Sequence, residues 1–176
     1  MRSFHIPSAV VVLLLLAVAG WTTTVLKMDL PALVQESDSI VQGQVERMDA
    51  LWDAQRKTIF TYISVKVHEP LKGEPGRTIL IRQIGGKVGT MNLSISGMPV
   101  FRNGEEVILF LKRNPEASYH VVGLSQGKYD IGSDFAVANV SGIELIDKKT
   151  GEAIDGGVVT REPLENFKSR IRRLVK

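Results

Sequence analysis

The strongest constraint on the fold is a two-residue alternation of side chains at positions 58–67. One face of this segment carries a β-branched residue at every second position, namely Ile59, Thr61, Ile63, Val65 and Val67. A period of two is typical of a β-strand with one buried face. Similar short segments, bounded by glycine-rich turns, occur at residues 39–48, 78–84, 107–111, 119–124, 128–131, 135–140 and 143–147. Strands at this spacing, with no helical period between them, predict a mainly β fold, either a barrel or a sandwich.

Helices are predicted only at the two ends of this strand series. Asp29 is a suitable N-cap and Pro31 lies in the first turn, so a short helix is expected at 30–37. A second, amphipathic helix is expected at 161–176, where the apolar positions are Leu164, Phe167, Ile171 and Leu174. The segment 107–111 is apolar at every position, which indicates a strand covered on both faces. The C-terminal helix is the candidate cover, with its basic face left in solvent.

The amino terminus has the pattern of an export signal. Arg2 and His5 precede an apolar run, and Ala17-Val18-Ala19 supplies the small residues that a signal peptidase reads. We therefore expect residues 1–20 to be a signal peptide and the protein to be periplasmic or extracellular. The alternative is an uncleaved membrane anchor at residues 9–26, a stretch without charge. The rest of the 176-residue chain is expected to be one barrel domain, residues 28–160, followed by the C-terminal helix.

Charge and cysteine content exclude several classes of protein. The net charge is +3, but residues 3–160 hold fifteen basic and seventeen acidic side chains, so the basic excess lies at the chain ends. A nucleic-acid-binding domain would carry its basic residues on the folded body. The chain has no cysteine, which excludes disulfides, a thiol nucleophile, cysteine-ligated zinc and a lipoprotein anchor. A cysteine-free exported chain fits a bacterial envelope better than a eukaryotic secretory route.

One enzyme motif occurs, and its context disagrees with catalysis. Residues 123–127 read Gly-Leu-Ser-Gln-Gly, which matches the G-x-S-x-G nucleophile elbow with Ser125 as its serine. That elbow joins a strand to a helix and is followed by its histidine, whereas here strands flank the motif and His5, His68 and His120 all precede it. We read the pentapeptide as a tight turn. Metal sites and phosphate-binding loops lack their ligands, so no catalytic residue, metal or cofactor is expected.

Three segments together resemble a known family. They are Ala32-Leu33-Val34-Gln35-Glu36-Ser37-Asp38-Ser39-Ile40-Val41-Gln42-Gly43-Gln44-Val45, His68-Glu69-Pro70-Leu71-Lys72-Gly73 and Phe101-Arg102-Asn103-Gly104-Glu105-Glu106-Val107-Ile108-Leu109-Phe110-Leu111. This order, over residues 29–131, resembles the netrin-like, TIMP-like OB-fold domains of exported bacterial proteins. The resemblance implies a small five-stranded, OB-like barrel with a flanking helix. In the animal inhibitors of this family an N-terminal cysteine chelates the protease zinc, and that mechanism does not carry over to a chain without cysteine.

The remaining functional candidate is the glycine-rich segment 85–99. Its apolar side chains fit one more strand, with Leu93 and Ile95 facing inward, and the functional alternative is a binding lip at the barrel mouth. The predicted binding face comprises Gly85, Gly86, Met91, Met98, Gln126 and Lys128. We expect a non-enzymatic module that binds a protein or another envelope component, with membrane contact only through an uncleaved N-terminal segment. The alternatives are a carrier of a small apolar ligand and a serine hydrolase using Ser125.

Overall fold

The computed structural model describes residues 24–138, 140, 143–147, 150–155 and 159–175. The predicted signal peptide, residues 1–20, lies outside these ranges. The described part of the alternative anchor is its last three residues, Thr24–Leu26, which form strand β1. Within the described ranges, no helix combines the length and the apolar character needed to span a bilayer.

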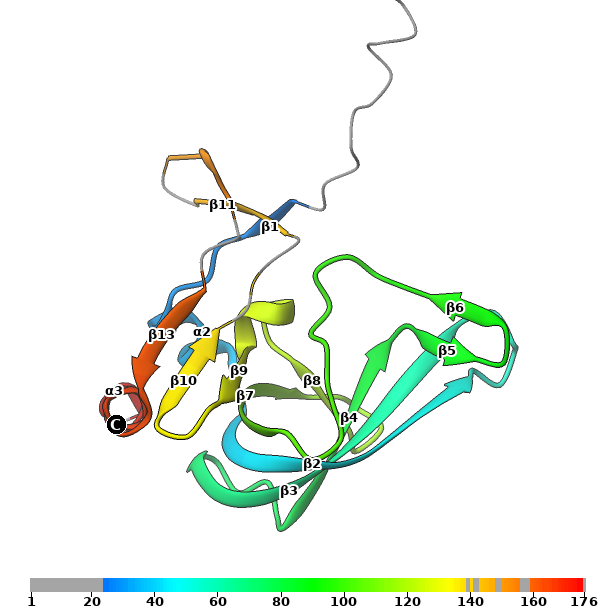
Figure 1. Ribbon diagram of the computed structural model, residues 1–176, viewed down its shortest axis with the longest axis horizontal. Helices are drawn as coiled ribbons and strands as arrows, with labels where there is room; N and C mark the ends of the chain where they lie inside the picture. Colours follow the sequence, from blue (N-terminus) through cyan, green and yellow to red (C-terminus); the bar gives the residue numbers. More distant parts are fainter. Residues whose placement is uncertain (1–23, 139, 141–142, 148–149, 156–158, 176) are drawn as a thin grey trace, which may run out of the picture.

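Five strands of the described chain close a small barrel (Figure 1). They are β2 (Ser39–Trp52), β3 (Ile59–Lys72), β4 (Thr78–Ile84), β7 (Glu106–Arg113) and β8 (Tyr119–Val121). Around the ring, β2 pairs with β3, β3 with β4, β4 with β8, β8 with β7, and β7 with β2. The β4–β8 pairing is parallel, and the other four are antiparallel. This five-stranded Greek-key ring confirms the mainly β, OB-like barrel expected from the sequence.

The two longest strands extend beyond the predicted segments. β2 continues four residues past Met48, and β3 continues past Val67 through Pro70 to Lys72. Pro70 is tolerated because β4 pairs with β3 only as far as Lys66, so Pro70 has a single neighbouring strand and needs no second ladder hydrogen bond. Gly43 lies at a register shift between β2 and β3, and a Cβ there would lie 2.3 Å from the Lys66 carbonyl oxygen. The glycine therefore permits the close approach that bends the barrel.

The later strands form two further groups. β9 (Lys128–Ile131), β10 (Phe135–Ala138) and β13 (Thr160–Pro163) continue the sheet outward from β7. β11 (Glu144–Ile146) and β12 (Ala153–Asp155) instead form a separate three-stranded sheet with β1. The segment after residue 135 therefore both extends the barrel sheet and forms a separate hairpin.

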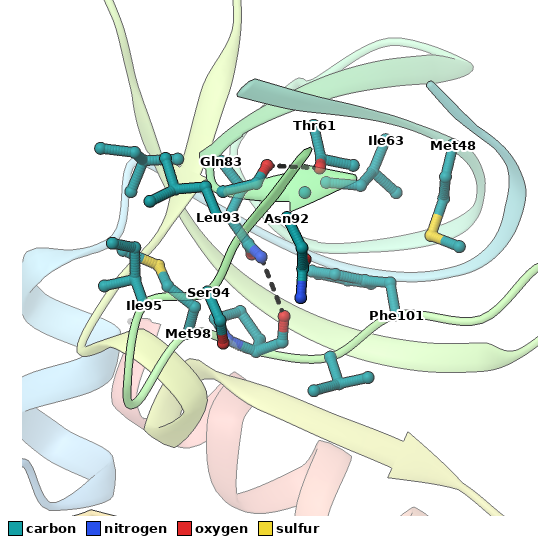
Figure 2. A pocket seen from close by; sticks show the side chains of 15 residues that line it. Met48, Thr61, Ile63, Gln83, Asn92, Leu93, Ser94, Ile95, Met98 and Phe101 are labelled. Atoms are coloured by element: carbon teal, nitrogen blue, oxygen red, sulfur yellow. Dashed lines mark hydrogen bonds between the residues drawn. The ribbon is translucent and has the colours of Figure 1, made fainter. Parts of the chain in front are cut away.

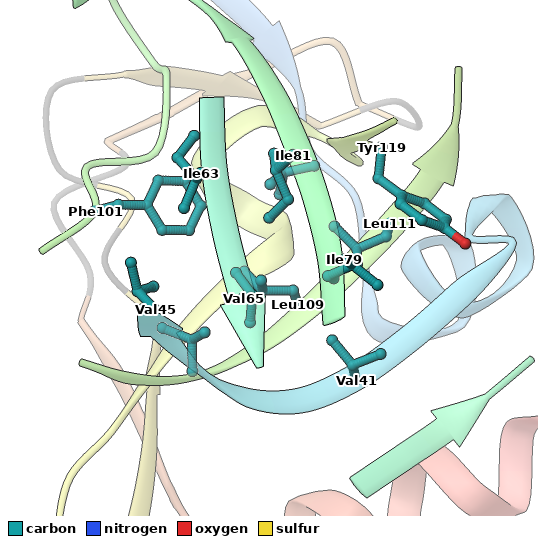
Figure 3. Packing of buried hydrophobic residues seen from close by; sticks show 12 residues of the cluster. Val41, Val45, Ile63, Val65, Ile79, Ile81, Phe101, Leu109, Leu111 and Tyr119 are labelled. Atoms are coloured by element: carbon teal, nitrogen blue, oxygen red, sulfur yellow. The ribbon is translucent and has the colours of Figure 1, made fainter. Parts of the chain in front are cut away.

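The barrel interior is filled by its own side chains (Figure 3). Inward-facing positions of all five strands, together with Phe101, form one buried cluster: Val41, Val45, Ile63, Val65, Ile79, Ile81, Phe101, Val107, Leu109, Leu111, Tyr119 and Val121. Small barrels are usually solid in this way. The interior therefore has no room for a ligand, and a hollow that could hold one lies at the barrel mouth.

A second core covers the outer face of β7. Ile108 and Phe110 point away from the barrel and pack with α2 (Leu30–Glu36) and α3 (Leu164–Val175). The rings of Phe110 and Phe167 meet edge to face, 6.4 Å between centroids, and Tyr129 packs against Phe167 at 4.4 Å. Burial raises the pKa of Tyr129 to about 12. The C-terminal helix thus covers the second face of β7, as the apolar run at 107–111 predicts.

Three details of α3 differ from the sequence expectation. The helix begins at Leu164 and not at residue 161, because residues 161–163 belong to strand β13. Leu174, assigned to the buried stripe, is exposed, because the helix contact ends at Ile171. Lys168, assigned to the solvated basic face, is buried and lies between Glu69 and Glu165. Its neighbour Arg172 also pairs with Glu69. The basic face of the helix is therefore partly neutralised by the domain, not left free in solvent.

Candidate functional site

A hairpin forms one wall of the barrel mouth. The sequence presented residues 85–99 as a glycine-rich loop, but Gly86–Val88 and Met91–Leu93 pair as antiparallel strands β5 and β6. Gly85 and Gly86 connect β4 to this hairpin with φ angles of 105° and 133°. Such angles are open to glycine and rare for other residues. The two glycines therefore turn the chain sharply and bring β5 onto the ends of β2 and β3.

An open cleft of about 370 Å³ lies between this hairpin and the loop before β7 (Figure 2). We call it the mouth cleft. Its apolar walls include Met48, Ile63 and Phe101 on one side and Ile95 and Met98 on the other. Two hydrogen bonds set its shape: Thr61 Oγ1 donates to the Gly85 carbonyl oxygen at 2.7 Å, and Gln83 Nε2 donates to the Pro99 carbonyl oxygen at 3.1 Å.

Apolar side chains at the cleft are exposed to solvent. Val100 is 69% exposed and Ile95 is 38% exposed, and both line the mouth cleft. Met91, on β6, is 57% exposed. Apolar side chains that gather around a hollow are typical of surfaces that bind a partner or a ligand. Methionines such as Met48 and Met98 add adaptable walls, because their side chains are unbranched and flexible.

The structure brings together three of the six predicted binding residues. Gly85, Gly86 and Met98 line the mouth cleft. Met91 lies on the same hairpin but outside the cleft lining, with its side chain in solvent. Lys128 lines a neighbouring hollow that shares Met98 with the mouth cleft.

Gln126 occupies a structural position instead of an exposed binding face. Its side chain is buried and accepts a hydrogen bond from the Met28 backbone N–H at 2.8 Å. It also donates to the carbonyl oxygens of Leu26 and Gly123 at 3.1 and 3.2 Å. These contacts fasten the chain before α2 to the turn at residues 124–127. Met28 and Leu26 lie about a hundred positions from Gln126 in sequence, so no local pattern indicates this role.

The G-x-S-x-G motif forms a 3₁₀ turn, Leu124–Gly127, between strands β8 and β9. Ser125 Oγ is buried and has no hydrogen-bond partner, so no base is bonded to it. His120 Nδ1 lies 2.7 Å from Asn114 Oδ1, and His68 Nδ1 lies 3.3 Å from Glu106 Oε2. Burial and the nearby Lys112 lower the pKa of His120. Both described histidines are thus engaged with other partners.

Sequence reasoning missed several residues of the cleft. Thr61, Ile63 and Met48 come from β3 and β2, and they reach the cleft because the ring closes around them. Phe101 belongs to the buried cluster of the barrel and also lines the cleft. The alternation at 58–67 assigned Thr61 and Ile63 to the buried face, but nothing local indicated that this face ends in a hollow.

The chain matches no protein-family model and no curated protein sequence. Among the residues that the structure describes, no three His, Asp or Glu side chains gather closely enough to hold a metal ion.

Proposed function

We propose that this protein is an exported, non-enzymatic binding module that holds an apolar segment of a partner protein in the mouth cleft. The observation that carries the proposal is an open, apolar cleft at the mouth of a barrel whose interior is already full. Exposed Val100 and Ile95 give a partner apolar surface to cover. Burying such side chains contributes about 25 cal/mol per Å² of apolar surface removed from water.

The proposed envelope location is supported by the sequence alone. The positive, then apolar pattern of residues 1–20 supports export, with a tether at residues 9–26 as the alternative. The resemblance of residues 29–131 to netrin-like domains of exported bacterial proteins agrees with this location. For this chain the zinc-chelating mechanism is set aside, because no cysteine is present.

A second candidate function is a carrier of a small apolar ligand. The observation that favours it is the volume of the mouth cleft, about 370 Å³, which falls within the usual range of about 300–1,000 Å³ for small-molecule pockets. An open cleft covers less of a small molecule than an enclosed cavity would. We therefore rank the carrier function second.

Photo-crosslinking in cells that make the protein distinguishes these functions. A benzophenone amino acid replaces Val100 at the cleft or, as the matched control, Leu80, which is 42% exposed on β4 and does not line the cleft. We expect an adduct of several kilodaltons or more from position 100 and none from position 80. The additional change Ile95→Asp should abolish the adduct while leaving the urea midpoint unchanged, because Ile95 is already solvent-exposed.

The mass of the adduct decides between the candidates. A gain of a few hundred daltons at position 100 would favour the carrier. Equal adducts from both positions, or none from position 100, would contradict binding at the mouth cleft.

A further inference from the structure

The chain enters the described structure beside the mouth cleft. β1 runs parallel to β11, with Thr24 opposite Glu144 (Figure 1). Because the two strands run in the same direction, the chain approaches Thr24 from the end of the sheet where Ile143 lies. Ile143 is buried, and its Cγ2 would lie 2.7 Å from a Cβ added at Gly97. Gly97 directly precedes Met98, which lines the mouth cleft, so the chain enters next to the cleft.

Hydrogen bonds hold this entry point in place. The Lys27 N–H donates to the Ile146 carbonyl oxygen at 2.8 Å. The Gln126 side chain donates to the Leu26 carbonyl oxygen and accepts from the Met28 N–H. The end of β1 is therefore fastened both to β11 and to the turn that contains Gln126, and the fold itself sets the distance between the start of β1 and the cleft.

The segment that leads to this entry point carries one large apolar side chain. Residues 20–23 read Gly-Trp-Thr-Thr, have no charged side chain and lie outside the described ranges. Cleavage after Ala19, as the sequence predicts, would make Trp21 the second residue of the exported chain. Three extended residues span about 10 Å. From Thr24, the Trp21 side chain is therefore within reach of the neighbouring cleft.

The mouth cleft suits an indole in size and chemistry. Its volume is about 370 Å³, and among the described residues that line it none has an ionisable side chain. Met48 and Met98 offer sulfur atoms, whose contacts with aromatic rings are favourable. Asn92 and Ser94 add side-chain oxygens that can accept a hydrogen bond from the indole N–H (Figure 2). An uncharged aromatic side chain with one donor therefore fits this site.

We propose that, once the signal peptide is removed, Trp21 occupies the mouth cleft of its own molecule and a partner segment has to displace it. The occupancy stands on the geometry of β1 and the cleft, whereas the displacement rests on the proposed function. A short tether gives the indole an effective concentration of about millimolar, which favours its own cleft over that of a second copy. A cleft that is occupied part of the time binds a partner less tightly in proportion.

The fluorescence of Trp21 tests the occupancy. The protein is isolated after export with its own signal, its mass locates its first residue, and Trp52→Phe leaves Trp21 as the sole tryptophan. We expect emission at shorter wavelength than that of free tryptophan, with reduced quenching by acrylamide. Ile95→Asp, in the cleft wall, should shift the emission to longer wavelength and restore quenching. Leu80→Asp, at an exposed site away from the cleft, is the matched control and should change neither.

Photo-crosslinking at position 100 tests the displacement and leaves Trp52 in place. Trp21→Ala should raise the yield of the partner adduct about 2- to 3-fold, because the cleft is then free more of the time. Thr22→Ala, in the same segment, is the matched control and should leave the yield unchanged.

The two proposals fail separately. Trp21 emission that matches free tryptophan, or that does not respond to Ile95→Asp, would overturn the inference and leave the proposed function standing. Shielding that is lost on dilution would assign Trp21 to the cleft of a second copy, and an exported protein that retains residues 1–19 would hold Trp21 beside a membrane anchor; both results also overturn it.

The crosslinking result completes the distinction. Equal adduct yields with and without Trp21→Ala would contradict the displacement. If the cleft shields Trp21 but no adduct forms at position 100 even in Trp21→Ala, the occupancy stands and the proposed function fails.

Discussion

At the scale of single residues, the mouth cleft depends on Gly86. Its φ of 133° is one that side-chain-bearing residues rarely adopt, and a Cβ there would lie 2.4 Å from Thr61 Oγ1. That hydroxyl is already committed to the Gly85 carbonyl oxygen. Both the backbone angle and the close contact therefore exclude a side chain, and the glycine couples the hairpin to β3.

We expect Gly86→Ala to lower the free energy of unfolding by about 1–3 kcal/mol from backbone strain alone. Urea denaturation measures this loss. Gly132→Ala is the matched control, because a Cβ at Gly132 would meet no atom within 4 Å, and its effect should stay within about 0.5 kcal/mol. Equal stabilities of the two variants would show that the hairpin does not depend on a glycine at position 86.

At the scale of elements, the local sequence predicted the helices and strands whose buried side chains recur at a simple period. The alternation at 58–67 and the Asp29 cap correspond to β3 and α2, and β4 has the predicted bounds. The hairpin β5–β6 was less visible, because its strands are only three residues long and are bounded by glycines. β3 runs past its predicted end through Pro70, because a strand end with one neighbour accepts a proline that a central strand would reject.

The candidate site was predictable only in part. Gly85, Gly86 and Met98 came from the local composition of one segment, and the cleft does lie there. The buried positions of Gln126 and Lys128 depend on partners from distant parts of the chain, such as Met28 and Glu105. Composition identifies a polar side chain, but only the closed ring decides whether that side chain faces solvent.

The attachment of α3 to β3 is predicted to depend on pH through Glu69. Burial alone would raise the pKa of the Glu69 carboxyl, but hydrogen bonds from Lys168 and Arg172 outweigh it, so its pKa is lowered from 4.5. A carboxyl with a lowered pKa in the folded state stabilises the fold above its unfolded pKa, and this contribution is lost as the pH falls through the folded value.

Glu69→Gln should therefore lower the free energy of unfolding by about 1 kcal/mol at pH 7. The difference from the unsubstituted protein should shrink toward zero once the pH is well below 4.5, where Glu69 itself becomes protonated. Urea denaturation across this range provides the measurement. Glu74→Gln, at an exposed turn, should have no comparable effect at either pH. A loss in Glu69→Gln that is constant with pH would contradict an ionic attachment.

At the scale of the whole molecule, one strand joins two cores. Val107, Leu109 and Leu111 of β7 point into the barrel, whereas Ile108 and Phe110 point toward the helices. If β7 detaches from one core, it detaches from the other as well, and the apolar side chains of both cores become exposed. The barrel and its helical cover should therefore unfold in a single step.

We expect Ile171→Ala, a change in the helical core, to destabilise the distant barrel equally. Ile171 is fully buried, so its truncation should cost about 2–5 kcal/mol. The urea midpoints from far-UV circular dichroism and from Trp52 fluorescence, measured in a Trp21→Phe background, should fall together. If α3 melted first while the Trp52 signal kept its original midpoint, the two cores would be independent units.

The unpaired end of β3 bears on how the protein behaves in a crowded compartment. Beyond Lys66, β3 has no β4 neighbour, and a bare strand edge is a template on which other chains can add and aggregate. Pro70 lies within this stretch and offers no N–H to an incoming strand. Glu69 beside it is held in ion pairs by Lys168 and Arg172 of α3. The proline and the charges together make this edge a poor starting point for fibres.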